Sequence, residues 1–255
     1  MRWPAAILAS IALLVPAAAA AYVPSPQYGA FEIKFGPYTP NVDDEPGLQP
    51  NEEGRLPYES AFNDGAMFLT MLELDYQFLR LRGINFGVGG GVGFMQTYAK
   101  AQTVSGAQSA DYTVLNVMPF VLLGVVRVDV LASELRVPIV PYFKGGLNWY
   151  LWWVLGGGET AEFTYEDEQG NTHSEKGKGG TPGWQISPGI AIQLDGFDRM
   201  SARTFDNEIG VNHSYLFFEY TYAQVEGLFG GKNMYLSPTD LGSNGTWMIG
   251  VALEF

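Results

Sequence analysis

The terminal stretch TWMIGVALEF, from Thr246 to Phe255, decides how the rest of the sequence is interpreted. Every second residue counted back from Phe255 is large and apolar, whereas the residues between them are mostly small or polar. Such alternation predicts a β-strand with one apolar face, because successive side chains of a strand point to opposite sides. A strand of a soluble protein would turn this face towards a core and would rarely end the chain on an aromatic residue. The other segments must therefore show what the apolar faces meet.

The composition favours one domain with an unusual surface. The chain has 255 residues, of which 47% are hydrophobic, 14% aromatic and 16% charged, and it contains 32 glycines. Charged residues usually make up about a quarter of a soluble domain, whereas a barrel with a lipid-facing exterior needs fewer. The mean hydropathy of +0.01 argues against a bundle of membrane helices. It does not argue against a barrel, because alternation hides half of the hydrophobicity.

Charge and cysteine content exclude several classes of function. The net charge of −13 argues against a nucleic-acid partner. The chain has no cysteine, which excludes disulfides, thiol chemistry and cysteine-ligated metals.

Residues 1–21 have the pattern of a signal peptide. Arg2 supplies a positive start, residues 5–15 are apolar, and residues 17–21 are small enough for a cleavage site. The apolar run is shorter than the roughly 20 residues that a membrane-spanning helix needs, which disfavours an uncleaved anchor. We therefore expect the mature chain to begin near Ala21 or Tyr22, outside the cytoplasm.

Eight segments have the pattern of strands. They are residues 31–36, 67–78, 84–98, 113–126, 137–153, 184–194, 213–223 and 246–255. Long connections (38–65, 99–111, 154–183 and 224–245) alternate with three short turns, as expected for outer loops and periplasmic turns. The predicted fold is all-β, an eight-stranded antiparallel up-and-down transmembrane β-barrel over residues 22–255. The even strand count places both termini on the periplasmic side with six arginines of the short turns: Arg80, Arg82, Arg127, Arg136, Arg199 and Arg203.

Local features add further expectations. Segment 113–126 is apolar on both faces and contains Pro119, which cannot donate to a neighbouring strand, so we expect a bulge there. We assign Val121 of this segment to the lipid-facing side. Glycines occupy the inward side of segment 84–98, and the change Gly89→Ser is expected to be mild. Loop 154–183 should contain a hairpin of residues 163–165 and 172–174, and a helical piece is expected around 198–205.

The aromatic end of the chain resembles the last strand of bacterial outer-membrane barrels, which the insertion machinery recognises. By this resemblance Phe255, Leu253 and Val251 form the assembly signal. The architecture as a whole is similar to the small eight-stranded barrels, a class that includes OmpX, OmpW and the transmembrane domain of OmpA. Residues 141–146 and 31–38 also resemble small barrel proteins of predatory delta-class bacteria, whose functions are mostly unassigned. The resemblance implies a monomer in the outer membrane of a Gram-negative cell, with the barrel-assembly machinery, lipid and lipopolysaccharide as partners.

Charged residues on the inward faces form the candidate site of the lumen. They are Glu32, Lys34, Glu73, Asp75, Lys144 and Glu219. A charge inside a narrow barrel must be paired, because an isolated buried charge costs several kcal/mol. We expect Glu73 or Glu219 to be the partner of Lys144. The cluster could serve a gated pore or a salt-bridge plug, and the plug is favoured because side chains fill an eight-stranded interior.

Large aromatic residues near the long-loop ends of the strands predict an interfacial girdle. They are Trp149, Trp153, Trp184, Trp247 and Tyr222.

Catalytic, cofactor and metal sites are not predicted. Two histidines are present, and His213 is adjacent to Ser214, so a strand would point the two to opposite faces and prevent nucleophile–base pairing. His173 lies in a loop beside a serine without an acid at triad spacing. The acidic groups 43–45 and 166–168 could bind Ca²⁺ but lack EF-hand spacing. We favour a solvated face beside a membrane whose phosphates are bridged by divalent cations.

The sequence therefore predicts an outer-membrane barrel with a structural or surface-interaction role and acidic outer loops. The alternative is a narrow channel for small or hydrophobic solutes. A soluble ligand-binding barrel comes third, because it would need its apolar face turned inward.

Overall fold

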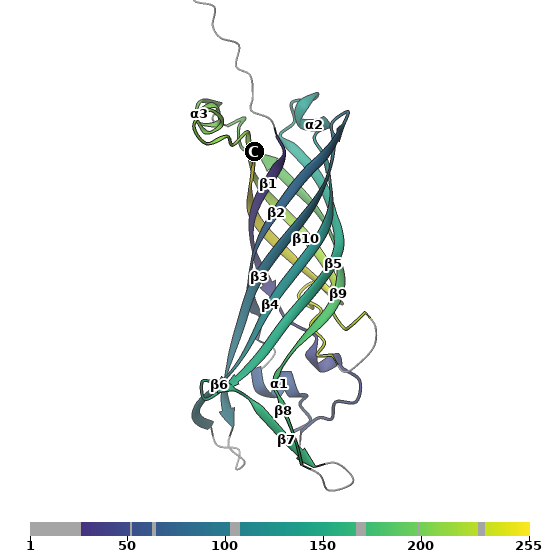
Figure 1. Ribbon diagram of the computed structural model, residues 1–255, viewed down its shortest axis with the longest axis vertical. Coiled ribbons are helices and arrows are strands. Elements are labelled where there is room, and N and C mark those ends of the chain that lie inside the picture. Colours follow the sequence, from purple (N-terminus) through teal and green to yellow (C-terminus); the bar gives the residue numbers. More distant parts are fainter. Residues whose placement is uncertain are drawn as a thin grey trace, which may run out of the picture.

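The computed structural model describes residues 27–51, 53–62, 65–102, 108–166, 172–197, 199–228 and 233–255. The predicted signal peptide, residues 1–21, lies outside these ranges. Eight antiparallel strands close into an elongated barrel, which confirms the predicted fold (Figure 1). They are β1 (Gly29–Tyr38), β2 (Met67–Leu81), β3 (Ile84–Gln102), β4 (Gln108–Val128), β5 (Ile139–Gly156), β9 (Lys178–Gln193), β10 (His213–Gln224) and β11 (Gly245–Glu254). No helix in the described ranges is long and apolar enough to cross a membrane.

The terminal strand closes the barrel against the first one. In the register of β1 and β11, Phe31 lies opposite Leu253 and Ile33 opposite Val251. At the end of the chain, the Phe255 amide donates to the Gly29 carbonyl at 2.9 Å, and the Gly29 amide donates to the Phe255 carbonyl at 2.8 Å. Every strand of the closed sheet therefore has a partner on both sides, which removes the exposed edges of an open sheet.

The barrel wall is apolar outside, and charged side chains lie on the inner face of several strands. On β2, Leu72, Leu74 and Tyr76 are exposed, whereas Glu73 and Asp75 between them are buried. The same outward apolar pattern occurs on β4, β5, β10 and β11. A soluble ligand-binding barrel would need the opposite arrangement, so the exterior is suited to lipid.

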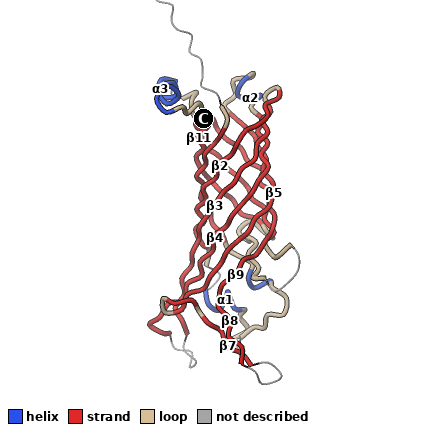
Figure 2. The backbone as a smooth tube through the Cα atoms, viewed as in Figure 1, coloured by secondary structure: helices blue, strands red, loops and turns tan. Residues whose placement is uncertain are grey.

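Helices and extra strands lie at the two ends of the barrel (Figure 2). The long loops contain η1 (Val42–Asp44), α1 (Pro57–Phe62), β6 (Glu159–Thr160), β7 (Glu162–Glu166) and β8 (Thr172–Lys176). The short-turn end holds α2 (Val130–Ser133) and α3 (Arg199–Ile209). The expected loop hairpin and helical piece are thus both present, with Thr164 opposite Ser174 in the β7–β8 pair.

Most strands are longer than predicted at the loop end, and the largest differences are in β3, β4, β5 and β9. β3 and β4 extend to Gln102 and from Gln108, so most of the predicted loop 99–111 is a strand hairpin. Likewise β5 ends at Gly156 and β9 begins at Lys178, which shortens the loop predicted at 154–183. These extensions mix charged, polar and small residues without a regular alternation, so hydrophobic periodicity could not reveal them.

The expected bulge at Pro119 is absent, and that prediction was wrong. β4 pairs with β5 in one unbroken register, with Pro119 opposite Tyr150. Against β3, the register is the same on both sides of the proline, since Phe120 pairs with Val92 and Val117 with Met95. Pro119 has no N–H group to donate, and β4 accommodates it by a gap in the pairing with β3. No extra residue is inserted into the strand, so there is no bulge.

One face assignment and the expected effect of one substitution also require correction. Val121 points inward and is buried, whereas its neighbour Leu122 is exposed on the outer wall. At this level the lumen-facing and the lipid-facing residues of β4 are both apolar. The sequence therefore could not show which of them face the lumen. The space beside Gly89 is occupied, because a Cβ atom there would lie 2.0 Å from Oδ1 of Asp75. The change Gly89→Ser would therefore displace a buried carboxylate and is not mild.

Candidate functional site

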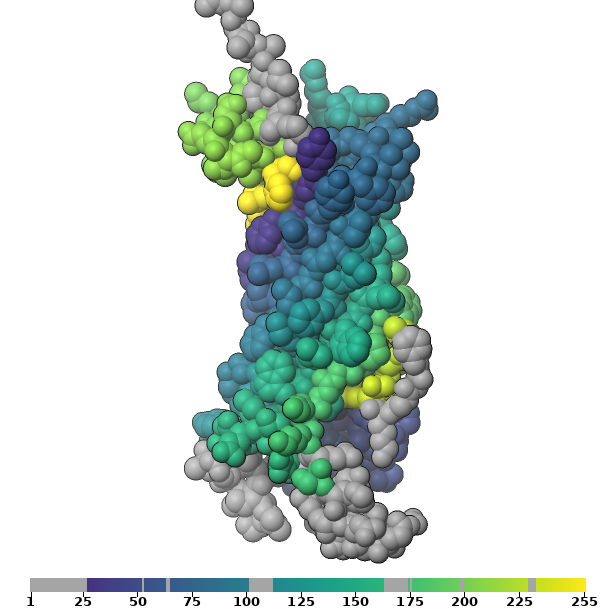
Figure 3. All heavy atoms as spheres, in the orientation of Figure 1, coloured from purple at the N-terminus to yellow at the C-terminus, as the bar shows by residue number. Residues whose placement is uncertain are grey.

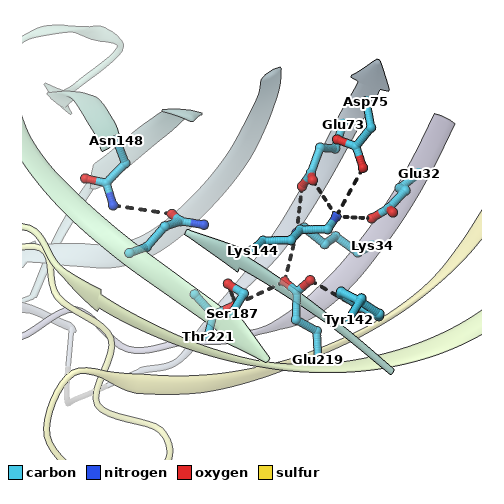
Figure 4. A network of polar contacts seen from close by, with 11 residues as sticks. Glu32, Lys34, Glu73, Asp75, Tyr142, Lys144, Asn148, Ser187, Glu219 and Thr221 are labelled. Carbon is cyan, nitrogen blue, oxygen red and sulfur yellow. Dashed lines mark hydrogen bonds and ion pairs between the residues drawn. The ribbon is translucent and has the colours of Figure 1, made fainter. Parts of the chain in front are cut away.

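The six predicted charged residues of the lumen come together in one cluster (Figure 4). β1 supplies Glu32 and Lys34, β2 supplies Glu73 and Asp75, β5 supplies Lys144, and β10 supplies Glu219. All six are at most 3% exposed. The strands place them there because each occupies an inward position of the period-two pattern.

Lys144 is the centre of one half of the cluster. Its ammonium group donates to Oε2 of Glu32 at 2.6 Å and to Oε1 of Glu73. Oδ2 of Asp75 lies 3.8 Å away. Glu73 had been expected as a partner of Lys144, whereas the contacts with Glu32 and Asp75 had not.

Lys34 is the centre of the other half. Its ammonium group lies 2.8 Å from Oε1 of Glu219 and 2.8 Å from Oε2 of Glu73. Glu219 is therefore the partner of Lys34, not of Lys144 as the alternative expectation had it. Glu73 contacts both lysines and joins the two halves into one network.

Hydroxyl groups complete the network around Glu219. Its Oε2 accepts from the Tyr142 hydroxyl at 3.2 Å, and its Oε1 accepts from Thr221 at 3.1 Å. Thr221 is in turn 3.0 Å from the Ser187 hydroxyl. These contacts satisfy oxygens that burial has removed from water, which is the condition for a stable buried ion pair.

The cluster contains more carboxylates than cations. Two lysines face four acidic side chains, and Asp75 has the weakest contacts of the four. Neither of its carboxylate oxygens has a hydrogen-bond partner among the described residues. The ammonium groups already supply positive charge at the position where a metal ion would otherwise neutralise the acids.

A second polar layer lies towards the short-turn end of the lumen. Glu254 of β11 accepts from the Tyr215 hydroxyl and from Nε2 of Gln77, both at 2.7 Å. The guanidinium of Arg127 lies 4.8 Å from the centre of the Tyr215 ring, within the range of a cation–π contact. Arg127 had been assigned to a short turn, but it belongs to β4 and is only 3% exposed. The sequence alone does not show whether a charged residue at this point belongs to the end of the strand or to the turn that follows.

The opposite end of the lumen is closed by apolar residues and by two outer loops. The side chains of Tyr38 and Tyr150 are buried at this end, and the Tyr38 hydroxyl donates to the Leu236 carbonyl at 2.6 Å. Leu236 and Ser237 are fully buried although they belong to the loop before β11. The Ser237 amide donates to Oδ1 of Asn41 at 2.7 Å, which joins this loop to the loop after β1. Loop residues without periodicity gave no sequence signal for this closure.

The outer loops are ordered by their own acidic residues. The Asp43 carboxylate accepts from the amides of Tyr58 and Glu59 at 2.7 and 2.8 Å, which caps the first turn of α1. Asp240 accepts from the amide and hydroxyl of Thr39 at 3.0 and 2.9 Å. Asp43, one of the residues weighed as a Ca²⁺ ligand, thus has a structural role in this loop.

His213 and Ser214 share Asp195 as an acceptor. Nδ1 of His213 contacts Oδ2 of Asp195, and the amide and hydroxyl of Ser214 donate to Oδ1 at 3.1 and 3.3 Å. Burial alone would raise the pKa of Asp195, but hydrogen bonds from His213, Gln193 and the Ser214 amide lower the pKa below its usual value. This arrangement fixes the turn before β10 and does not place the serine against the imidazole. The side chain of His173 lies outside the described part of the chain.

The predicted aromatic girdle residues all point outward. Trp149 is exposed on β5, and the others pack against neighbours on the outer wall. Trp184 lies 5.5 Å from Tyr222, Trp153 lies 6.4 Å from Phe94, and Trp247 lies 6.1 Å from Phe218, measured between ring centres. These pairs form an aromatic surface on neighbouring strands, as expected at a membrane interface.

An exposed apolar outer face and a polar, charged interior are features of transmembrane β-barrels. The chain is a small β-barrel of the outer-membrane type. No family model and no curated protein matches the sequence. Three solved structures are similar over 90% of this chain. They are the attachment invasion locus protein Ail of Yersinia pestis (12% identity, 99% of that chain, TM-score 0.39), OprG from Pseudomonas aeruginosa (11%, 97%, 0.45) and the N-terminal β-barrel domain of Pseudomonas aeruginosa OprF (11%, 100%, 0.34). At these identities the similarity concerns the fold alone.

Deleting Phe255 is expected to lower the amount of folded barrel in the outer membrane, because its backbone joins β11 to β1. Secretion across the inner membrane should remain intact. Heat-modifiable gel mobility of outer-membrane fractions measures the folded amount. Replacing Phe255 with Tyr keeps the aromatic end and the backbone bonds and is the matched control. An unchanged yield after deletion would show that Phe255, Leu253 and Val251 are not the assembly signal.

Proposed function

We propose that this chain is a monomeric outer-membrane protein that acts through its outer loops and not through its lumen. The observation that carries the proposal is the filled interior. Lys34, Lys144, Glu73 and Glu219 are at most 1% exposed halfway along the barrel, and they hold one another in place. Apolar residues and loops close the lumen on one side of this plug, and the Arg127–Tyr215–Glu254 layer narrows it on the other.

The outer loops support a surface-interaction role. The loop after β1 and the loop before β11 are bonded to each other through Thr39–Asp240 and Asn41–Ser237, so this part of the mouth presents an ordered surface. Exposed acidic residues occur on it, including Asp44, Glu53, Glu159 and Glu162. An ordered acidic surface beside the membrane suits cationic partners or the divalent cations that bridge lipopolysaccharide phosphates. We propose no enzymatic role, since general base catalysis needs a base within reach of a nucleophile.

Planar bilayer recordings test the proposal against the channel alternative. Purified protein, shown to be folded by its gel mobility, is expected to give no discrete steps of steady conductance. A channel would give such steps, and replacing Lys34 with Gln would change their ion preference because the cation would line the conducting path. Reproducible steps with this change in selectivity would overturn the plug and assign the function to the lumen.

A further inference from the structure

Helix α3 has an exposed apolar surface that the barrel itself does not explain. It lies in the turn between β9 and β10, and Figures 1 and 3 show it set to the side of the barrel, near the C-terminus. Phe197, Met200, Phe205 and Ile209 are 77%, 79%, 47% and 66% exposed. Phe197 precedes the helix and Met200 lies on the opposite side from Ile209, so Phe205 and Ile209 form the exposed apolar side of α3. An exposed apolar side of this kind marks a surface that contacts another apolar phase.

The helix is held in a defined orientation. Asp206 is 6% exposed, and its Oδ1 accepts from Nδ2 of Asn212 at 3.4 Å. Gly210 ends the helix with a φ of +73°, and its amide donates to the Asp206 carbonyl at 3.1 Å. Phe205 and Ile209 are one turn apart and therefore lie on the same side of the helix. The buried Asp206 thus fixes the helix against the turn, and Phe205 and Ile209 beside it remain exposed.

This apolar surface continues the lipid-facing wall. Ile192 and Leu216 pair across β9 and β10 immediately below the turn, and both are exposed on the outer face. Leu135, in the turn between α2 and β5, is also strongly exposed. The helix therefore lies next to exposed apolar residues of the barrel wall.

A cavity adjoins α3. It has a volume of about 350 Å³ and is lined by Arg136, Arg203, Asn212, His213 and Asp195, among others. Asp195 is the acceptor of three hydrogen-bonding neighbours, and the two arginines add positive charge to the lining. Guanidinium groups bind phosphate oxygens in bidentate geometry, so this lining is complementary to a phosphate group.

We propose that α3 is an interfacial anchor, with its apolar side in the membrane leaflet at the short-turn end and the adjacent cavity holding the phosphate headgroup of a phospholipid. An amphipathic helix of this kind buries its apolar face at the boundary between headgroups and acyl chains. The lateral position of α3, its continuity with the lipid-facing wall and the arginines of the cavity all favour lipid over a protein partner. The inference rests on the membrane placement of the barrel but not on the role of its loops.

Spin labelling tests the position of the helix. Because the chain has no cysteine, the single variants Phe205→Cys, Ile209→Cys and Asn207→Cys can each carry one nitroxide. In phosphatidylethanolamine–phosphatidylglycerol nanodiscs, labels at 205 and 209 are expected to collide more with oxygen than with a water-soluble nickel chelate. The label at 207, on the other side of the helix, should show the reverse. Equal nickel accessibility at all three positions would place α3 in water and overturn the anchor, and protection of 205 and 209 from both reagents would indicate a protein contact instead.

Lipid retention tests the headgroup site. Native mass spectrometry of the detergent-extracted barrel should show bound phosphatidylglycerol. Each of the changes Arg136→Gln and Arg203→Gln should reduce retention about fivefold, as expected for one basic residue near an anionic lipid surface. The matched control, Arg82→Gln, removes an arginine from a different short turn and should have no effect. Equal loss in the control, or displacement of the lipid by inorganic phosphate alone, would overturn a phospholipid site, while gel mobility verifies that each variant is folded.

Discussion

Replacing Lys144 with Met is expected to destabilise the folded barrel by about 3–5 kcal/mol, the usual cost of removing one member of a buried ion pair. Glu73 would keep its contact with Lys34, but Glu32 would lose the ammonium group that lies 2.6 Å from it. Asp75 would lose its nearest cation as well. Equilibrium unfolding in urea with the barrel in lipid vesicles measures the change in free energy.

A second substitution separates the two halves of the cluster. Adding Glu32→Gln to Lys144→Met should recover part of the lost stability, because the stranded carboxylate is then neutral. Adding Glu219→Gln should recover much less, because Glu219 is bonded to Lys34. Double-mutant cycles on both pairs give the two coupling energies directly. Equal couplings would show that Lys144 does not discriminate between these carboxylates, and additive effects in both cycles would indicate a solvated cation and favour the pore.

The sequence was sufficient for the fold wherever the two faces of a strand differ in polarity. On β2, Leu72 and Leu74 alternate with Glu73 and Asp75, so the pattern correctly predicted which residues face lipid and which face the lumen. On β4, Val121 and Leu122 are both apolar, and the assignment failed because lumen and lipid were lined alike. The predicted fold was correct in spite of this error. An apolar segment of this length predicts a strand even when it does not show which side chains face the lumen.

The pairing within the lumen could only be partly predicted. Inward positions identify the residues, but the stagger between strands decides which of them lie at the same height. Lys34 and Glu219 are on β1 and β10, separated by β11, and nothing in either segment indicates that they meet. Leu236 closes the mouth of the barrel and Arg127 lies inside it because of tertiary contacts. No periodic pattern in the sequence indicates either of these contacts.

Replacing Leu74 with Arg is expected to destabilise the barrel in a bilayer by about 2–4 kcal/mol, because a guanidinium would enter the hydrocarbon at the membrane centre. Leu74 is exposed on the outer wall at the midpoint of β2. Val121, which the sequence pattern assigned to the lipid-facing side, is unsuitable for this test because its side chain faces the lumen. Urea unfolding in lipid vesicles measures the difference from the unmodified chain.

Leu81 provides the matched control on the same strand. It is also exposed on the outer wall but lies at the short-turn end of β2, so an arginine there can reach the headgroups and should cost only about 0–1 kcal/mol. Both substitutions replace leucine with arginine, so the residue types are the same at the two sites. The difference between the two losses of stability therefore reports the depth of each site in the membrane. Equal costs at both sites would mean that the middle of β2 does not lie in hydrocarbon. Negligible costs at both would return the chain to the class of soluble barrels, because only a hydrocarbon environment penalises an outward arginine in proportion to its distance from the interface.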